Sequence, residues 1–223
     1  MFPSATVSVL IPAAGQGTRL GRGPKAFVRV GGRTLLEWVI EAFAWADEVR
    51  VALPSDAAPP PAPANVRFVR GGAERQQSVA RLLEGARGDV VLVHDAARPF
   101  VVPAVVDRLL EAVAVGGAAV PAVPVPDTLI EPAEGRYGPA LDRSRYALVQ
   151  TPQAFFREVL AEAHELARTR SLTATDEAQL VRALGYPVEL VPGDRRMFKV
   201  TFPEDLELAE ALARSWPPEP ERA

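Results

Sequence analysis

Short apolar runs alternate along the chain with longer segments in which apolar residues recur at helical spacing. The runs predict strands at residues 7–11, 48–53, 66–69, 89–94, 118–123 and 188–191, a short strand at 26–30 and a strand that carries Lys199. The helical spacing predicts helices at 35–46, from 75, at 103–115, 154–167 and 175–184, and from 203, the first of them capped by Thr34. This alternation predicts an α/β protein with a mostly parallel central sheet flanked by helices.

Residues 124–150 break this alternation. Short alternating runs around Gly135 and Gly138 indicate a β-hairpin arm. An arm with little core of its own usually packs against another surface, so we expect a homodimer in which the arm contacts the partner subunit. Residues 1–215 are otherwise expected to form a single domain, and the tail 216–223 is expected to be disordered.

The segment after the first strand is rich in glycine. The thirteen residues that follow Pro12 contain four glycines, Gly15, Gly17, Gly21 and Gly23. Because glycine lacks a Cβ, backbone N–H groups can approach a ligand closely and form an anion-binding concavity. Arg19, Arg22 and Lys25 add positive charge to the same segment. It therefore predicts a loop that binds a triphosphate.

The two standard glycine motifs fit this loop poorly. The pattern G-x-G-x-x-G needs its last glycine one residue before Gly21, and the Walker Gly-Lys-Ser/Thr is absent. A glycine-rich surface turn is therefore the alternative. Lysine usage favours a binding loop: of the 25 lysines and arginines only Lys25 and Lys199 are lysines, which indicates that a compact point charge matters at both places.

Polar residues also follow two later strands. A glycine pair precedes a helix whose first turns hold Arg75 and Ser78, and this helix either receives a polar ligand at its N-terminus or is simply capped. Asp95 directly follows the most strand-like run of the chain. Ligands of parallel sheets bind beyond the carboxyl ends of the strands, so Asp95 either holds a hard cation such as Mg²⁺ or caps a turn and pairs with Arg98.

Composition excludes several classes of protein. The net charge of −3 at pH 7 argues against a protein whose main ligand is nucleic acid, and no apolar run approaches the ~20 residues that span a membrane. Without cysteine there are no disulfides or thiolate metal sites, and two histidines do not make a histidine-rich site. We read no signal peptide and expect a cytoplasmic protein.

These parts fit nucleotidyl transfer better than other phosphate chemistry. No Ser–His or Cys–His nucleophile stands out, and a kinase would need a base or a water-positioning residue. A phosphorylated acceptor is already anionic at pH 7, so the catalyst has to bring two polyanions together and stabilise charge on the α-phosphorus. Arg19, Lys25 and Lys199, with Mg²⁺, are the groups we expect to do this.

The blocks IPAAGQGTRLGRGPKAF, GGAERQQSV, VLVHDAARPF, PVPDTL, ALDRSRYALVQTPQAF, TATDEAQLV and FKVTFPEDLELAE follow one another along nearly the whole chain. In this the chain resembles the 2-C-methyl-D-erythritol 4-phosphate cytidylyltransferases of the non-mevalonate isoprenoid pathway. Many nucleotidyltransferases share the first block, whereas VHDAARPF with TPQAF and TDEA downstream is more particular to the cytidylyl branch. The resemblance implies a Rossmann-like nucleotidyltransferase fold with a protruding arm, and transfer of the cytidylyl group of CTP to methylerythritol phosphate with Mg²⁺.

The resemblance also implies roles for matching residues. The residues expected around the nucleotide are Ala13, Ala14, Gly15, Gly17, Gly72, Arg75, Ser78 and Arg98. The residues expected to position the acceptor or the reacting phosphates are Thr128, Arg143, Thr151 and Lys199. The expected catalytic residues are Arg19, Lys25, Arg143 and Lys199, and the expected Mg²⁺ ligand is Asp95. In this family the arm with Thr128 and Arg143 reaches into the neighbouring subunit.

Two alternatives stay open. A ribitol 5-phosphate cytidylyltransferase would keep the nucleotide loop and the aspartate and would differ in residues 128–151. A non-catalytic nucleotide-binding protein would lose some charged residues, whereas this chain keeps Arg19, Lys25, Asp95, Arg98, Arg143 and Lys199. The chain departs from the family pattern at Ala26 and Ala73, and Ala73 leads us to expect weaker or differently tuned CTP recognition.

Overall fold

An eight-stranded mixed sheet forms the centre of the computed structural model, which describes residues 5–21 and 23–217. The strand order is β10-β7-β11-β6-β1-β4-β5, and β12 also pairs with β7. The strands are β1 Val7–Pro12, β4 Glu48–Leu53, β5 Val66–Arg70, β6 Val90–Val93, β7 Ala118–Pro124, β10 Ala147–Val149, β11 Gln153–Phe156 and β12 Glu189–Pro192. All the pairs are parallel except those of β10 and β11 with their neighbours, which confirms the expected mainly parallel sheet.

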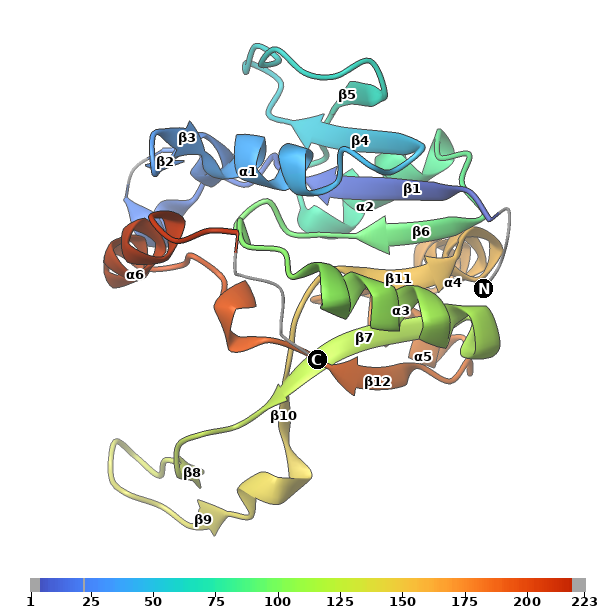
Figure 1. Ribbon diagram of the computed structural model, residues 1–223. Coiled ribbons are helices and arrows are strands. Elements are labelled where there is room, and N and C mark those ends of the chain that lie inside the picture. Colours follow the sequence, from blue (N-terminus) through green and yellow to red (C-terminus); the bar gives the residue numbers. More distant parts are fainter. Residues whose placement is uncertain (1–4, 22, 218–223) are drawn as a thin grey trace.

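Helices cover both faces of this sheet (Figure 1). They are α1 Leu35–Ala42, α2 Arg75–Glu84, α3 Pro103–Gly116, α4 Arg157–Arg170 and α5 Glu177–Ala183. A further helix, α6 Pro203–Ala213, packs beside the sheet against the segment that contains β2. The apolar residues of α1 and α3 pack on one face, and those of α2, α4 and α5 pack on the other. Thr34 caps α1 as expected: its hydroxyl accepts the backbone N–H of Glu37, whose carboxylate in turn accepts the N–H of Thr34.

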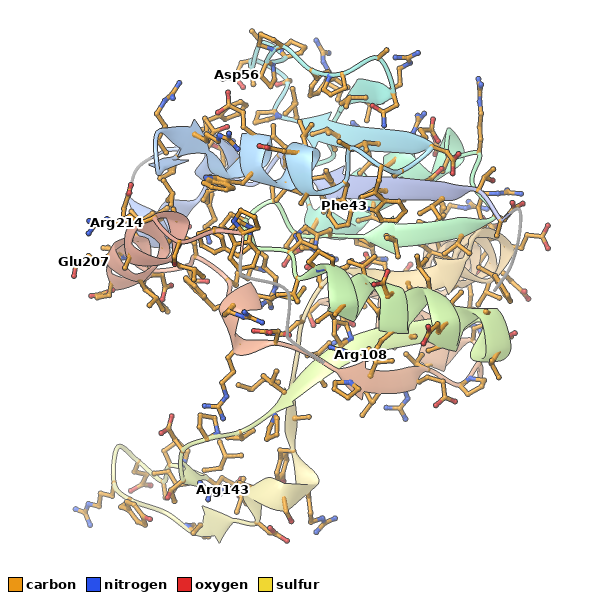
Figure 2. The ribbon with its side chains drawn as sticks, in the orientation of Figure 1. Phe43, Asp56, Arg108, Arg143, Glu207 and Arg214 are labelled. Atoms are coloured by element: carbon orange, nitrogen blue, oxygen red, sulfur yellow. The ribbon has the colours of Figure 1, made fainter. Side chains whose placement is uncertain are left out.

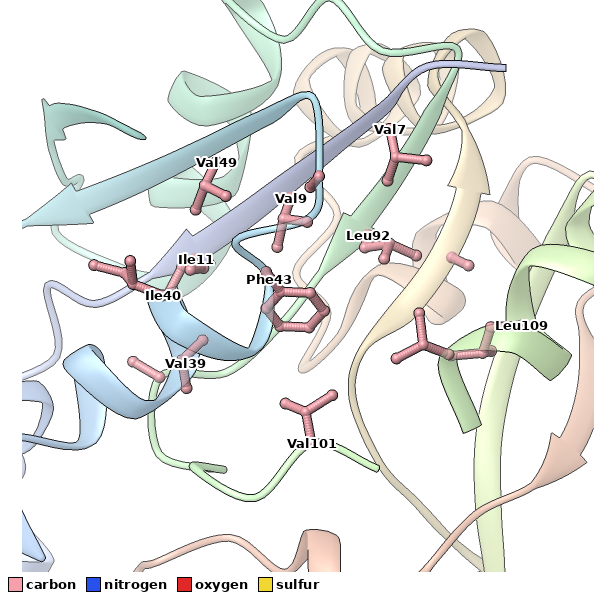
Figure 3. Packing of buried hydrophobic residues seen from close by; sticks show 14 of the residues in the cluster. Val7, Val9, Ile11, Val39, Ile40, Phe43, Val49, Leu92, Val101 and Leu109 are labelled. Carbon is pink, nitrogen blue, oxygen red and sulfur yellow. The ribbon is translucent and has the colours of Figure 1, made fainter. Parts of the chain in front are cut away.

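Strand β1 shows how the sequence builds two cores from one strand. Val9 and Ile11 point towards α1 and α3, whereas Leu10, between them, packs with the helices of the opposite face. This alternation follows from the two-residue period of a strand. Phe43, directly after α1, is fully buried among the apolar residues of this face (Figure 3). Its ring meets the ring of His94 with centroids 5.2 Å apart.

Three of the predicted elements are wrong in part. The helix predicted at 154–167 begins only at Arg157, because Gln153–Phe156 forms β11 between β6 and β7. The strand predicted at 26–30 is a 3-10 turn, Lys25–Phe27, followed by the two-residue strand β2 Arg29–Val30, which pairs with β3 Arg33–Thr34. The segment that carries Lys199 is assigned no strand; it follows the 3-10 turn η4 Arg195–Met197.

The predicted arm is present and projects away from the sheet and its helices (Figure 1). Its tip is a small hairpin in which β8 Leu129–Ile130 pairs with β9 Ala140–Leu141, and most residues between them are exposed. At the other end of the chain, Trp216 packs on Phe100 with ring centroids 5.1 Å apart. Of the tail expected to be disordered, residues 218–223 lie outside the described residues.

Within the described residues, the helices are too short or too polar for any of them to cross a membrane.

Replacement of Phe43 should test how far the fold depends on this core. We expect Phe43→Ala to lower the free energy of unfolding by about 3–5 kcal/mol, because it leaves a cavity where a whole ring is buried. Urea denaturation measures this loss. Val115→Ala is the control, since Val115 is 92% exposed and should change stability by less than about 0.5 kcal/mol. Equal losses for the two variants would contradict the placement of Phe43 in the core.

Candidate active site

A pocket of about 250 Å³ opens beyond the carboxyl ends of β1, β5 and β6. This is where parallel sheets generally bind ligands. The lining residues that carry polar side chains are Thr18, Lys25, Glu74, Arg75, Ser78, Asp95 and Lys199. The backbone of the first glycine loop and that of the loop after β5 form much of the remaining wall.

The glycine loop after β1 has the backbone that its glycines permit. Gly17 lies in the left-handed region with φ 66°, and a Cβ there would overlap the carbonyl oxygen of Gly23 and lie 3.0 Å from the backbone nitrogen of Lys25. The loop therefore folds back on itself and brings Lys25 to the pocket wall. Arg19 lies in the 3-10 turn η1 Thr18–Leu20, and its side chain is outside the described part of the structure.

The second loop, between β5 and α2, is held by Ser78. The Ser78 hydroxyl accepts the backbone N–H of Gly72 at 3.0 Å and donates to the carbonyl of Glu74 at 3.1 Å. A Cβ on Gly71 would overlap the Cβ of Ala14, so the two loops touch because Gly71 has no side chain. Ser78 thus shapes the pocket wall from behind, in addition to lining it.

Asp95 lies between two cations at the floor of the pocket. One carboxylate oxygen accepts Nε of Arg75 at 2.9 Å, and the other accepts Nζ of Lys199 at 2.6 Å. Asp95 is 8% exposed. Burial alone would raise the pKa of its carboxyl, but Arg75 and Lys199 outweigh burial and hold this pKa well below its usual range. Asp95 is therefore an anion at neutral pH.

Arg75 extends this network to a second buried acid. Its Nη1 donates to both carboxylate oxygens of Glu177, at 2.9 and 2.8 Å, and Glu177 is only 1% exposed. Burial would lower the pKa of Arg75, but Glu177 and Asp95 outweigh it and raise this pKa above its usual value. Burial raises the pKa of the Glu177 carboxyl above its usual value, and the neighbouring Arg75 opposes this rise.

The turn that carries Asp95 is fixed by a chain of buried hydrogen bonds. Burial lowers the pKa of His94 to about 4, so its ring is neutral at pH 7. Nε2 of His94 lies 2.9 Å from the carbonyl oxygen of Arg98, which can only accept, so Nε2 carries the proton. Nδ1 then accepts the Thr151 hydroxyl at 3.2 Å, and the hydroxyl oxygen accepts the backbone N–H of Asp95 at 3.1 Å.

A second pocket, of about 490 Å³, lies on the far side of Lys199. Its lining residues are Arg98, Val123, Pro124, Pro126, Ala147, Leu148, Val149, Gln150, Arg195, Phe198 and Lys199. Lys199 is the one residue that lines both pockets among the residues described. Lys199 therefore stands at the boundary between them, with its ammonium group at Asp95.

The structure brings most of the predicted site residues together. The first pocket is lined by Ala13, Ala14, Gly15, Gly17, Lys25, Gly72, Arg75, Ser78, Asp95 and Lys199. Arg98 lines the second pocket, and its guanidinium donates to the carbonyl of Met197 at 2.7 Å. The suggested ion pair of Asp95 with Arg98 is therefore wrong, because Asp95 pairs with Arg75 and Lys199 instead.

Three of the predicted residues, Thr128, Arg143 and Thr151, line neither pocket. Thr128 and Arg143 are on the arm. Figure 2 shows Arg143 on the arm, well separated from the body of the chain. Its guanidinium donates to the carbonyl of Pro126 within the same arm. Thr151 lies beneath Asp95 rather than in a pocket wall.

Two residues at the site carried no recognisable functional signal in the sequence. Glu177 is 102 residues from Arg75, and only the fold brings the N-terminus of α5 beneath α2. It occurs in the block TATDEAQLV, but nothing local to that block indicates that its carboxylate faces Arg75. Arg195 lines the second pocket and is one of many arginines in the chain.

The donor set at Asp95 is compatible with a magnesium ion. In the described part of the chain, no three acidic or histidine side chains gather into a metal site. Protein-bound Mg²⁺ in phosphate chemistry commonly takes one or two carboxylates, with substrate phosphates and water as its other ligands. Each oxygen of Asp95 accepts one hydrogen bond and keeps a further lone pair. A single carboxylate at the pocket floor therefore fits a metal that arrives with a triphosphate.

Comparison with known proteins places this geometry in a family. Residues 7–215 match the family model described as IspD, 2-C-methyl-D-erythritol 4-phosphate cytidylyltransferase. The chain is 61% identical over 210 residues to the cytidylyltransferase of that name from Thermus thermophilus, covering 94% of this chain and 98% of the relative. It is 54% identical over 211 residues to that from Deinococcus radiodurans, covering 94% and 90%.

A solved structure agrees with these sequence matches. The crystal structure of a Thermus thermophilus 2-C-methyl-D-erythritol 4-phosphate cytidylyltransferase superposes with a TM-score of 0.88 at 58% identity, covering 94% of this chain and 99% of that one. The matched region includes both glycine loops, the Asp95 turn, the arm and the segment of Lys199. This chain belongs to the 2-C-methyl-D-erythritol 4-phosphate cytidylyltransferase family.

Proposed function

We propose that the chain transfers the cytidylyl group of CTP to 2-C-methyl-D-erythritol 4-phosphate, giving 4-diphosphocytidyl-2-C-methyl-D-erythritol and pyrophosphate. The observation that carries the assignment within this family is the position of Lys199 between two pockets. A transferase that joins two phosphorylated substrates needs their phosphates at one boundary, with a cation there. Lys199 meets this need.

The first pocket suits the nucleotide. Its two loops present backbone around a space that Lys25 enters from one side and Lys199 from another. Backbone N–H groups without a neighbouring Cβ, together with cations, stabilise triphosphate oxygens. Lys25, together with Arg19 in the same loop, would stabilise the charge that develops on the α-phosphate and the leaving pyrophosphate.

The second pocket suits the phosphorylated acceptor. Arg98 and Lys199 are cationic, and none of its lining residues is acidic. The acceptor phosphate is largely a dianion at neutral pH and is itself the nucleophile, so its oxygen can attack the α-phosphorus without a general base. The P–O bond to pyrophosphate breaks as the new P–O bond forms. Binding and orientation of two polyanions then account for most of the catalysis.

Asp95 would hold Mg²⁺ on the floor of the first pocket. When bound, the metal would neutralise phosphate charge and fix the triphosphate in one orientation. The chain's own contribution is to keep Asp95 ionised through Arg75 and Lys199 and to hold its backbone through Thr151.

The arm points to a homodimer. Thr128 and Arg143 line neither pocket of their own chain, yet Arg143 is a strong phosphate-binding residue type. We propose that each arm delivers these residues to the acceptor pocket of its partner. The cytoplasm, where CTP and Mg²⁺ are available, is the proposed location.

A direct assay tests the reaction. With CTP and Mg²⁺, we expect pyrophosphate release with methylerythritol 4-phosphate and none with ribitol 5-phosphate or without acceptor. Removing the metal with EDTA should stop the release, and added Mg²⁺ should restore it. Release with ribitol 5-phosphate alone would overturn the acceptor assignment but keep the nucleotide pocket. CTP binding without turnover would favour the non-catalytic alternative.

Lys25→Ala should lower kcat strongly, by a factor on the order of 10²–10³, because it removes a cation aimed at developing phosphate charge. Its melting temperature should stay close to that of the wild type, since Lys25 lines a pocket rather than the core. Arg87→Ala removes an exposed charge from the segment before β6, at the opposite end of that strand from the pocket, and serves as the control. Wild-type turnover in Lys25→Ala would show that the glycine loop is not the catalytic loop.

A mixing experiment tests the arm. We expect Lys25→Ala and Arg143→Ala to be weakly active alone and to regain about a quarter of wild-type activity when co-expressed. In random pairing half of the dimers are mixed, and each mixed dimer has one site with both residues intact if Arg143 acts across the interface. No recovery in a mixture that light scattering shows to be dimeric would mean that Arg143 acts within its own chain.

A further inference from the structure

Two neighbouring arginines of η4 have different surroundings. The guanidinium of Arg196 is bound by Asp194, with Nε 3.0 and 3.1 Å from its two carboxylate oxygens and Nη2 2.5 Å from one of them. Arg195 lines the second pocket, and its side chain makes no hydrogen bond or ion pair to any residue that the structure describes. The charge of Arg196 is therefore neutralised by its neighbour Asp194, whereas the charge of Arg195 is not neutralised within the turn.

Among the described residues that line the second pocket, none is acidic, so none balances the charge of Arg195. Its other cations are Lys199, which is paired with Asp95, and Arg98, whose guanidinium donates to the backbone carbonyls of Met197 and Val149. Arg195 is the cation of this pocket that has no partner within the described residues. An unbalanced guanidinium in a pocket without carboxylates attracts a phosphate.

The backbone under Arg195 is held rigidly. The side chain of Gln150, next to β10, donates to the carbonyl of Asp194 at 2.8 Å and accepts the backbone N–H of the same residue at 3.1 Å. A Cβ on Gly193 would overlap Oε1 of Gln150, so this double hydrogen bond depends on a glycine there. Met197, on the other side of Arg195, is fully buried. The base of the Arg195 side chain is thus fixed at the pocket wall, which lowers the entropy cost of binding.

We infer that Arg195 binds the phosphate of the acceptor and makes the second pocket selective for phosphorylated polyols. The inference rests on the proposed function and adds a residue to it. Arg195 is the first cation that an incoming phosphomonoester meets in the second pocket. Lys199 then holds the same phosphate at the boundary with the nucleotide pocket. Arg195 thus sets acceptor affinity, whereas Lys25 sets the rate of the chemical step.

Kinetics of Arg195→Gln test this. We expect the KM for methylerythritol phosphate to rise about fivefold, because an exposed charge-assisted contact to phosphate is lost, with kcat and the KM for CTP nearly unchanged. Arg195→Lys should recover part of the loss, since it restores a cation without the bidentate geometry. Calorimetric binding of methylerythritol phosphate without CTP should weaken by a similar factor, which gives a readout independent of turnover.

Arg196→Gln is the matched control, because it removes the same charge one residue away. We expect its KM for the acceptor to stay within about twofold of the wild type, since Asp194 already occupies that guanidinium. The inference would be overturned if Arg195→Gln bound the acceptor as tightly as the wild type, or if both variants lost acceptor affinity equally. The proposed function would still stand in either case if the wild type converted the acceptor. A wild type that neither binds nor converts methylerythritol phosphate would overturn both.

Discussion

The ion pairs of Asp95 with Arg75 and Lys199 are the constraint on which the active site depends. A carboxylate buried to this degree is costly without partners, and the loss of one partner leaves an uncompensated charge. Here Asp95 has a cation at each oxygen, and Arg75 is itself shared with Glu177. Each acid of the network is paired with a cation, which allows the acids to be buried. The outermost member of the network, Lys199, is still 38% exposed and lines both pockets. The site therefore presents a cation to solvent while its acids stay inside.

This network also explains why the site needs the whole fold. Arg75 begins α2, Asp95 follows β6, Glu177 begins α5 and Lys199 follows η4. These segments are far apart in the sequence and meet because each lies near the same edge of the sheet. The chain His94–Thr151 adds a connection from β6 to the segment before β11. Binding residues on four elements are held at fixed separations by pairing among themselves, which is the preorganisation that phosphate chemistry requires.

The sequence predicted the elements whose patterns are unambiguous and missed those that tertiary pairing decides. The strand at β6 and the capped start of α1 were predicted correctly, because an apolar run and a capping residue are local signals in the sequence. The predicted helix 154–167 wrongly includes residues 154–156 of β11, because a short apolar run does not reveal its period. The pairing of this run with β6 and β7 is not a local property of the sequence. The partners of Asp95 were missed for the same reason: Arg98 is near in sequence, whereas Arg75 and Lys199 are near only in the fold.

Lysine usage is the sequence signal that agrees most directly with the geometry. Both lysines of the chain line the first pocket, although the chain uses arginine for all its other basic residues. An ammonium group is compact and can approach a phosphate oxygen from any direction, whereas a guanidinium imposes a planar fork. Lys199 stands at the boundary of two pockets and is paired with Asp95. In the proposed reaction it would also meet two different phosphates, and the compact group is the better fit for this position. The second pocket is lined by two arginines, Arg98 and Arg195, whose planar guanidinium groups suit a phosphate that stays in one orientation.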